Sequence, residues 1–364
     1  MTIRDVAKAI EEIAPLKYAE DFDNVGLLVG NYSTKVEGVL VTLDTLEETV
    51  DEAIASNCNL IVSFHPIIFG GLKKLNGNNY VERVVLKAIK NDIAIYATHT
   101  ALDNSKVGVS AKMCEVLGLQ NTKILIPKKG IVKKLITYVP NAEAEDLRSK
   151  LFEAGAGNIG NYSEASFNVE GMGTYKGNSD SNPAKGNKEE QHQEEETCIK
   201  VIFESKDESS VIKALLENHS YEEVAYQIIS TENVHQDIGM GMIGELAEAM
   251  SEDDFLNYTK MIFNTGCVRH SEKRNKSIKK VAVLGGSGSF AISNAIRQKA
   301  DAYISADFKY HDFFKAEGKI LLTDVGHYES EQFTKNLLVE YLTKKFTSFA
   351  VILSEKSTNP IYYL

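Results

Sequence analysis

The 364-residue sequence predicts an α/β fold, in which a parallel or mixed sheet is layered with helices, together with an inserted ferredoxin-like α+β domain. Near both ends of the chain, short apolar β-branched segments alternate with amphipathic ones, the pattern of a sheet covered by helices. The middle instead has the order strand, helix, strand, strand, helix, strand, which is typical of the ferredoxin-like unit. We therefore expect a discontinuous domain from residues 1–127 and 236–364, interrupted by an insert at 128–235.

The elements of the discontinuous domain follow from the periodicity of apolar residues. Thr2 is placed to cap a helix that Pro15 ends. A second helix is expected up to residue 57. The remaining elements of the first part are strands at 38–44, 60–64 and 93–98 and a helix at 80–90. Those of the last part are strands at 280–284, 302–305 and 320–323 and helices at 290–300 and 329–345.

The insert contains a long polar stretch between its two central strands. Its expected elements are strands at 133–139, 166–170, 197–203 and 225–229 and helices at 142–154 and 209–218. Residues 176–196 show no periodicity and are rich in Glu, Asn and Lys. Such a loop is expected to be a lid, a binding loop or a disordered segment, and the structural alternative for its acidic end is a solvated linker.

Composition and charge exclude several classes of protein. The net charge of −11 disfavours electrostatic binding of nucleic acid or of an anionic membrane over a large surface. The first residues carry Asp5, Glu11 and Glu12 where a signal peptide needs an apolar stretch, and no apolar run approaches the roughly 20 residues that span a bilayer. The four cysteines form no CxxC pair. We expect a cytoplasmic protein that binds neither nucleic acid nor membrane.

Histidine and acidic side chains follow four of the predicted strands. They are His65, His99 with Asp103, Asp307 with His311, and His327 with Glu331. The carboxyl ends of strands in an open α/β sheet are where ligands bind, so we expect these side chains to converge on a metal site. His and carboxylate ligands suit Zn, Fe, Mn or Ni, one or two ions per chain, and an open site lowers the pKa of bound water.

Each of these features also has a purely structural interpretation. A single His at a strand end is more often a hydrogen-bonded structural residue, and an i, i+4 His/Glu pair is usually a solvated helix face. The segment Gly285–Ser289 follows a strand and opens a helix, so its backbone amides are candidates to hold a phosphate. Glycines at such a turn serve close packing equally well, and the segment lacks the Lys of a P-loop.

Taken together, the motifs resemble the NGG-interacting-factor-three-like family, also named GTP cyclohydrolase I type-2 homologues. The segments that carry this resemblance span the chain and are 21–30, 65–72, 99–103, 285–289 and 326–331. The resemblance implies a two-metal site in a toroidal homohexamer. It implies that the metal ligands are His65, Asp103, His327 and Glu331, with Glu331 bridging both ions. His99 would line the site.

The sequence departs from the family pattern at two places. Phe64 stands where the family usually has the first of two adjacent histidines, and Ser305-Ala-Asp307 replaces the family's Thr-Gly-Glu. Without the first histidine, one ion keeps His65, His327 and Glu331, while the other keeps only Asp103 and Glu331. We therefore expect one firm metal site and one weakened or differently completed site.

Two functions of different classes are compatible with these residues. The first is a metal-dependent hydrolase acting on a small-molecule substrate, which the sequence does not identify. Nothing in the sequence identifies GTP as the substrate, because no set of residues that would recognise the guanine base is apparent. The second is a non-catalytic metal-binding interaction or regulatory module, which the loss of a ligand at Phe64 favours.

Overall fold

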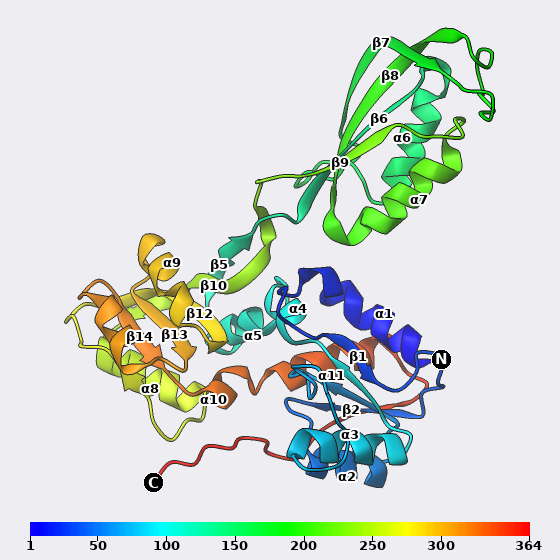
Figure 1. Cartoon of the computed structure of the whole chain (residues 1–364). Helices are drawn as coiled ribbons and strands as arrows, with labels where there is room; N and C mark the ends of the chain where they lie inside the picture. The colour runs from blue at the N-terminus through cyan, green and yellow to red at the C-terminus, as the bar shows by residue number, and fades with distance from the viewer. The chain divides into compact units, whose positions relative to one another are not determined.

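The computed structural model describes all residues 1–364, which divide into two compact units. One unit consists of Met1–Pro127 and Gln236–Leu364, and the other of Lys128–His235. The first unit is built on a five-stranded and a six-stranded sheet, and the second on a four-stranded sheet (Figure 1). No helix is both long and apolar enough to cross a membrane.

The five-stranded sheet has the order β1-β4-β3-β2-β15 and is parallel except at β1. Its strands are β1 (Gly26–Val29), β2 (Gly38–Thr42), β3 (Leu60–Ser63), β4 (Ala94–Ala97) and β15 (Ala350–Leu353). Side chains alternate across it: Val39 and Val41 face one apolar core, whereas Leu40 faces another. The helices over the first face are α1 (Ile3–Ile13) and α11 (Thr334–Lys345), and those over the second are α2 (Glu47–Ala55) and α3 (Tyr80–Lys90).

The six-stranded sheet has the order β11-β14-β13-β12-β10-β5, with a parallel centre of β12, β13 and β14. Its strands are β5 (Gln120–Lys128), β10 (His235–Met250), β11 (Arg269–His270), β12 (Ile278–Ser287), β13 (Ala302–Ala306) and β14 (Leu321–Asp324). One face packs on α5 (Val109–Val116) and α8 (Glu252–Ile262), and the other on α9 (Ile292–Arg297) and the 3-10 helix η5 (Tyr310–Ala316). Both sheets of this unit are therefore covered on both faces, as their near-continuous apolar strands require.

The insert is an antiparallel sheet of order β7-β8-β6-β9. Its elements are β6 (Val132–Pro140), α6 (Ala144–Glu153), β7 (Ser166–Lys176), β8 (Gln191–Glu204), α7 (Glu208–Asn218) and β9 (Tyr226–Ser230). The helices cover one face, where Leu135, Ile199 and Val201 form the core, and leave the other face uncovered by helices. The ferredoxin-like assignment stays a prediction, which this strand order supports.

Several elements differ from those expected from the sequence. The predicted helix at 80–90 is confirmed as α3, but the one expected at 329–345 is two helices, α10 (His327–Glu331) and α11. The expected loop at 176–196 is shorter in the structure and spans 177–190, because β7 runs to Lys176 and β8 begins at Gln191. The two strands of this hairpin are paired by backbone hydrogen bonds and carry mostly polar side chains, so the periodicity of apolar residues does not reveal their outer ends.

Candidate metal centre

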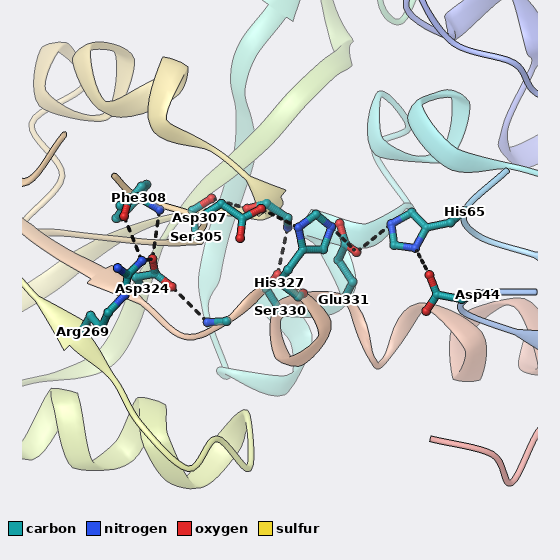
Figure 2. A network of polar contacts seen from close by, with 12 residues as sticks. Asp44, His65, Arg269, Ser305, Asp307, Phe308, Asp324, His327, Ser330 and Glu331 are labelled. Atoms are coloured by element: carbon teal, nitrogen blue, oxygen red, sulfur yellow. Dashed lines mark hydrogen bonds and ion pairs between the residues drawn. The ribbon is translucent and has the colours of Figure 1, made fainter. Parts of the chain in front are cut away.

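The candidate centre lies where strands of both large sheets end. His65 follows β3, and α4 (His99–Asp103) follows β4. On the other sheet, Asp307 follows β13, and α10 follows β14 and begins at His327. The two sheets thus deliver side chains from both ends of the chain to one place, at the edge where open α/β sheets bind ligands (Figure 2).

Three side chains meet at the centre. His65, His327 and Glu331 place one ligand atom each within 4.8 Å of one another. The Nε2 atoms of His65 and His327 both lie 3.2 Å from Oε2 of Glu331. Glu331 is buried, and its Oε2 has no partner that meets it with hydrogen-bond geometry. His327 and Glu331 lie one turn apart on α10, as their i, i+4 spacing predicts.

The Nδ1 atoms of His65 and His327, which face away from Glu331, each contact a carboxylate. Nδ1 of His65 lies 2.8 Å from Oδ1 of Asp44, and Nδ1 of His327 lies 2.7 Å from Oδ2 of Asp307 (Figure 2). An Nδ1–H donated to a carboxylate fixes the tautomer whose Nε2 carries a lone pair. Both lone pairs then point at the same buried carboxylate oxygen. Because two nitrogen lone pairs and a carboxylate oxygen repel one another, a proton or a metal cation is needed between them.

The pKa values of His65, His327 and Glu331 are shifted in the directions that place positive charge beside the carboxylate. Burial lowers the pKa of both histidines, but the carboxylates around them outweigh it and raise the pKa of His65 to about 10 and that of His327 to about 11. Burial also raises the pKa of Glu331, but the two histidines outweigh it and lower the pKa to about 2. Without another cation, the chain therefore neutralises Glu331 with protons on both imidazoles.

The spacing of the three atoms fits a metal ion. Two ligands at about 2.1 Å from one ion, at angles of about 100–109°, are roughly 3.2–3.4 Å apart. The observed separations of 3.2 Å lie in that range. The unpartnered Glu331 oxygen and the carboxylate-bound histidines are the donor set that a divalent cation satisfies. These three residues could hold such an ion, with Asp44 and Asp307 orienting the rings.

The fourth predicted ligand, Asp103, lies near this triad but outside it. Burial and, after it, the charge of Glu331 raise the pKa of Asp103 well above the ordinary value. His99 lines the centre instead of joining the triad: its ring centroid is 5.4 Å from that of His65, and its Nδ1 lies 2.8 Å from Asp23. The exposed ring of Phe69 lies beside His99, at 6.1 Å between centroids.

The start of α10 is held by a separate polar network at the end of β14. Asp324 pairs with Arg269, and it accepts hydrogen bonds from the backbone amides of Phe308 and Gly326 at 3.0 and 3.1 Å (Figure 2). Gly326 has φ +96°, a conformation that favours glycine. The network fixes the turn from which His327 projects, so it positions a ligand without touching the centre.

The glycine-rich segment 285–289 forms a wall of the centre. A Cβ on Gly286, whose φ is +66°, would lie 2.4 Å from Oε1 of Glu331 and 3.2 Å from Nε2 of His327. The amide of Gly286 donates to Oγ of Ser330 at 2.8 Å. This geometry supports the close-packing interpretation of these glycines, because side chains of the centre fill the space beside their backbone.

The expectation that His311 joins the centre is wrong. Asp307 has φ +57° and precedes η5, so the i, i+4 spacing of Asp307 and His311 does not lie on one helix. Asp307 faces His327 instead, and His311 is exposed between Tyr310 and Phe314.

Sequence reasoning missed the carboxylates that hold the histidines. Asp44 and Asp23 were not singled out, and Asp307 was assigned to the wrong partner. A usable signal for Asp44 was its position just after the buried strand β2, which neighbours the strand that carries His65. Asp23 precedes β1, which pairs with β4, the strand that leads to His99.

The fold and the site define an α/β protein in which two helix-covered sheets meet at a His/carboxylate cluster of the kind that holds metal ions. The chain belongs to the Duf34/NIF3 (NGG1p interacting factor 3) family, whose model matches residues 1–360. The resemblance inferred from the sequence motifs is thereby confirmed.

Curated relatives match along their whole length. The chain is 35% identical over 371 aligned positions to a GTP cyclohydrolase 1 type 2 homolog of Bacillus subtilis, covering 99% of this chain and 98% of the relative. It is 34% identical to a protein of the same name from Staphylococcus epidermidis, covering 100% of both.

Solved structures show the same fold. A Bacillus cereus protein related to NIF3 superposes with a TM-score of 0.82 at 35% identity, covering 100% of this chain and 99% of the other. The Staphylococcus aureus protein SA1388 superposes with a TM-score of 0.79 at 29% identity and the same coverage. The mixed α/β fold class predicted from the sequence is confirmed by these neighbours.

Proposed function

We propose that this chain is a divalent-metal-binding protein with a hydrolase-like centre that acts on a small-molecule substrate. The observation that carries the proposal is the approach of two imidazole Nε2 atoms to one buried, unpartnered carboxylate oxygen. The proposed ligands are His65, His327 and Glu331, with Asp103 beside them as the remaining ligand of a second, weaker position. Zn, Fe, Mn and Ni all suit this donor set.

The chain's own residues would bind and orient at this centre. A divalent ion held there would lower the pKa of bound water and act as a Lewis acid. Asp44 and Asp307 would keep both imidazoles in the ligating tautomer. Phe69 and the ring of His99 would line one side of the centre.

A second candidate function is a non-catalytic metal-binding interaction or regulatory module. It is favoured by Phe64, which is fully buried in the core where the family pattern has a histidine. The homohexamer and the cytoplasmic location that we expect belong to the proposal in either case. Native mass spectrometry of the purified chain tests the hexamer.

Elemental analysis of untagged protein purified without chelators tests the metal centre. We expect one to two equivalents of a first-row transition metal, lost in a His327→Ala, Glu331→Ala double variant. That result would justify screening the metal-loaded protein on phosphoesters, nucleotides and cyclic amides. No metal in either protein after reconstitution would refute the centre, and metal binding without turnover on any panel would favour the non-catalytic module.

A further inference from the structure

The insert contains a cavity that the proposed metal centre does not use. Its volume is about 910 Å³, within the range of pockets that enclose small organic ligands. It lies on the face of the four-stranded sheet opposite the helix-covered core, between β7, the loop at 177–190 and the segment before β9. We propose that this cavity binds a small organic molecule carrying a primary ammonium or guanidinium group.

Two glycines create the hollow. In β7, Val169, Gly171, Gly173 and Tyr175 alternate onto one face of the sheet, the face on which Val169 neighbours Cys198 and Tyr138 across the strands. A Cβ added at Gly171 would meet no atom within 4 Å. The glycines therefore leave space on the sheet between the larger side chains at either end.

A carboxylate lies at the inner side of this hollow. The side chain of Glu196 lies over Gly173, where a Cβ would come within 2.0 Å of Oε2. Glu196 is only 9% exposed, and its Oε1 accepts a hydrogen bond from the hydroxyl of Tyr221 at 2.8 Å. Its Oε2 accepts no hydrogen bond, and no lysine or arginine pairs with Glu196. A nearly buried carboxylate with one neutral partner is a strong acceptor for a cationic donor.

Aromatic rings line the cavity that contains this carboxylate. Tyr138, Tyr175 and Tyr221 all line the cavity, and the rings of Tyr175 and Tyr221 meet edge to face at 5.8 Å between centroids. The faces of such rings attract ammonium and guanidinium groups. Burial and nearby carboxylates, Glu196 for Tyr221, raise the pKa of both Tyr175 and Tyr221, so their hydroxyls stay neutral.

The charge around the cavity points to the same class of ligand. Five lining residues are acidic and one is a lysine: Glu170, Asp180, Glu196, Glu222, Glu223 and Lys176. None of the five acidic side chains forms an ion pair. An anionic ligand would meet repulsion here, whereas a cation is attracted. An N–H donor is favoured over a quaternary ammonium, because Oε2 of Glu196 offers a hydrogen-bond acceptor.

The loop at 177–190 completes the enclosure. The amide of Asn182 donates to Oε1 of Glu222 at 2.6 Å, and that of Glu189 donates to the carbonyl of Gly177 at 2.7 Å. Tyr175 donates its hydroxyl to the carbonyl of Lys185 at 3.1 Å. These contacts tie the polar loop to the cavity, so the long loop that the sequence shows without periodicity is a wall of this site.

Isothermal titration of the full chain with agmatine and benzylamine tests the proposal. Benzyl alcohol, which has nearly the shape of benzylamine without its charge, is the control ligand. We expect both cations to bind with Kd in the millimolar range or tighter, as suits ligands of this size, and benzyl alcohol to bind at least tenfold more weakly. Equal binding of benzylamine and benzyl alcohol, or no binding of either cation, would overturn the proposal.

Three variants localise the binding. Glu196→Gln should weaken benzylamine binding at least tenfold, whereas Glu195→Gln, on the neighbouring exposed residue outside the cavity, should leave it unchanged. Gly171→Leu should abolish binding, because the new side chain enters the cavity without meeting protein atoms. Circular dichroism checks that each variant is folded. Unchanged binding in folded Glu196→Gln and Gly171→Leu would place the ligand elsewhere and refute the site.

Discussion

Gly286 and Glu331 approach so closely that no side chain fits between them: a Cβ on Gly286 would lie 2.4 Å from Oε1 of Glu331. Gly286 also has φ +66° and donates its amide to Ser330, one residue before Glu331. The glycine-rich turn after β12 is therefore part of the framework of the metal centre. It holds the backbone against the carboxylate that both histidines face.

Gly286→Ala should disturb both stability and the centre. The left-handed backbone costs about 1–2 kcal/mol for an alanine, and the clash with Glu331 adds about 1–3 kcal/mol. Gly318→Ala is the matched control, since Gly318 has φ +63° and open space around the added Cβ. Chemical denaturation should show a larger loss for Gly286→Ala, together with weaker metal binding. Equal losses in both variants would mean that the contact with Glu331 contributes nothing.

Removing the carboxylates behind the histidines should weaken metal binding without removing a ligand. Asp44→Asn and Asp307→Asn each take away the charge that orients one imidazole, and loss of such a partner typically lowers metal affinity about 10–100-fold. Competition with a chelator of known affinity measures the change. Asp51→Asn, on an exposed residue of α2 that pairs with Lys87, should leave the affinity unchanged. Unaltered affinity in both site variants would contradict the proposed roles of Asp44 and Asp307.

The sequence predicted the parts of the molecule that depend on local pattern. Buried strands such as Leu60–Ser63 and Ala94–Ala97 are short apolar runs, and the histidines that follow them stand out against the strand pattern. The strand β10 was missed because its glycines and acidic residues break any alternation. The partner of His327 was missed for another reason: Asp307 reaches it through the pairing of β13 with β14, which no spacing within one segment encodes.

Protonation of Asp23 in acid should lower the free energy of unfolding of the chain. Burial raises its pKa, but hydrogen bonds from His99 and Thr100 outweigh it and lower the pKa to about 2. A group with a lowered pKa stabilises the fold above its unfolded-state pKa of about 4, and this contribution is lost as the pH falls toward 2. A shift of about two units corresponds to about 2–3 kcal/mol.

Thermal and urea unfolding of Asp23→Asn and wild type test this dependence. At pH 6 the variant should be less stable by about 2 kcal/mol, and the difference should shrink as the pH falls from about 4 toward 2. Asp21→Asn, on the exposed residue two positions earlier, should match wild type throughout. A difference that is the same at pH 6 and pH 3 would show that Asp23 acts through its shape and not its charge.

The variant Phe64→His tests whether Phe64, which replaces a histidine of the family pattern, limits how much metal the chain binds. The Phe64 ring is fully buried, and its centroid lies 4.9 Å from that of His65 and 5.6 Å from that of His99. An imidazole at this position would restore the histidine of the family pattern, and with it the nitrogen ligand that the weaker position of Asp103 and Glu331 lacks. We expect metal content to rise by up to one equivalent per chain, measured by elemental analysis after reconstitution.

Phe64→Leu provides the matched control, because it loses aromatic packing without adding a ligand. Both variants should be less stable than wild type without metal, since each removes a buried ring from the core, at a cost of about 1–3 kcal/mol. Only Phe64→His should regain stability when metal is added, because binding to the folded state alone stabilises it. A folded Phe64→His protein that binds no more metal than wild type would show that Phe64 is not what limits the second position.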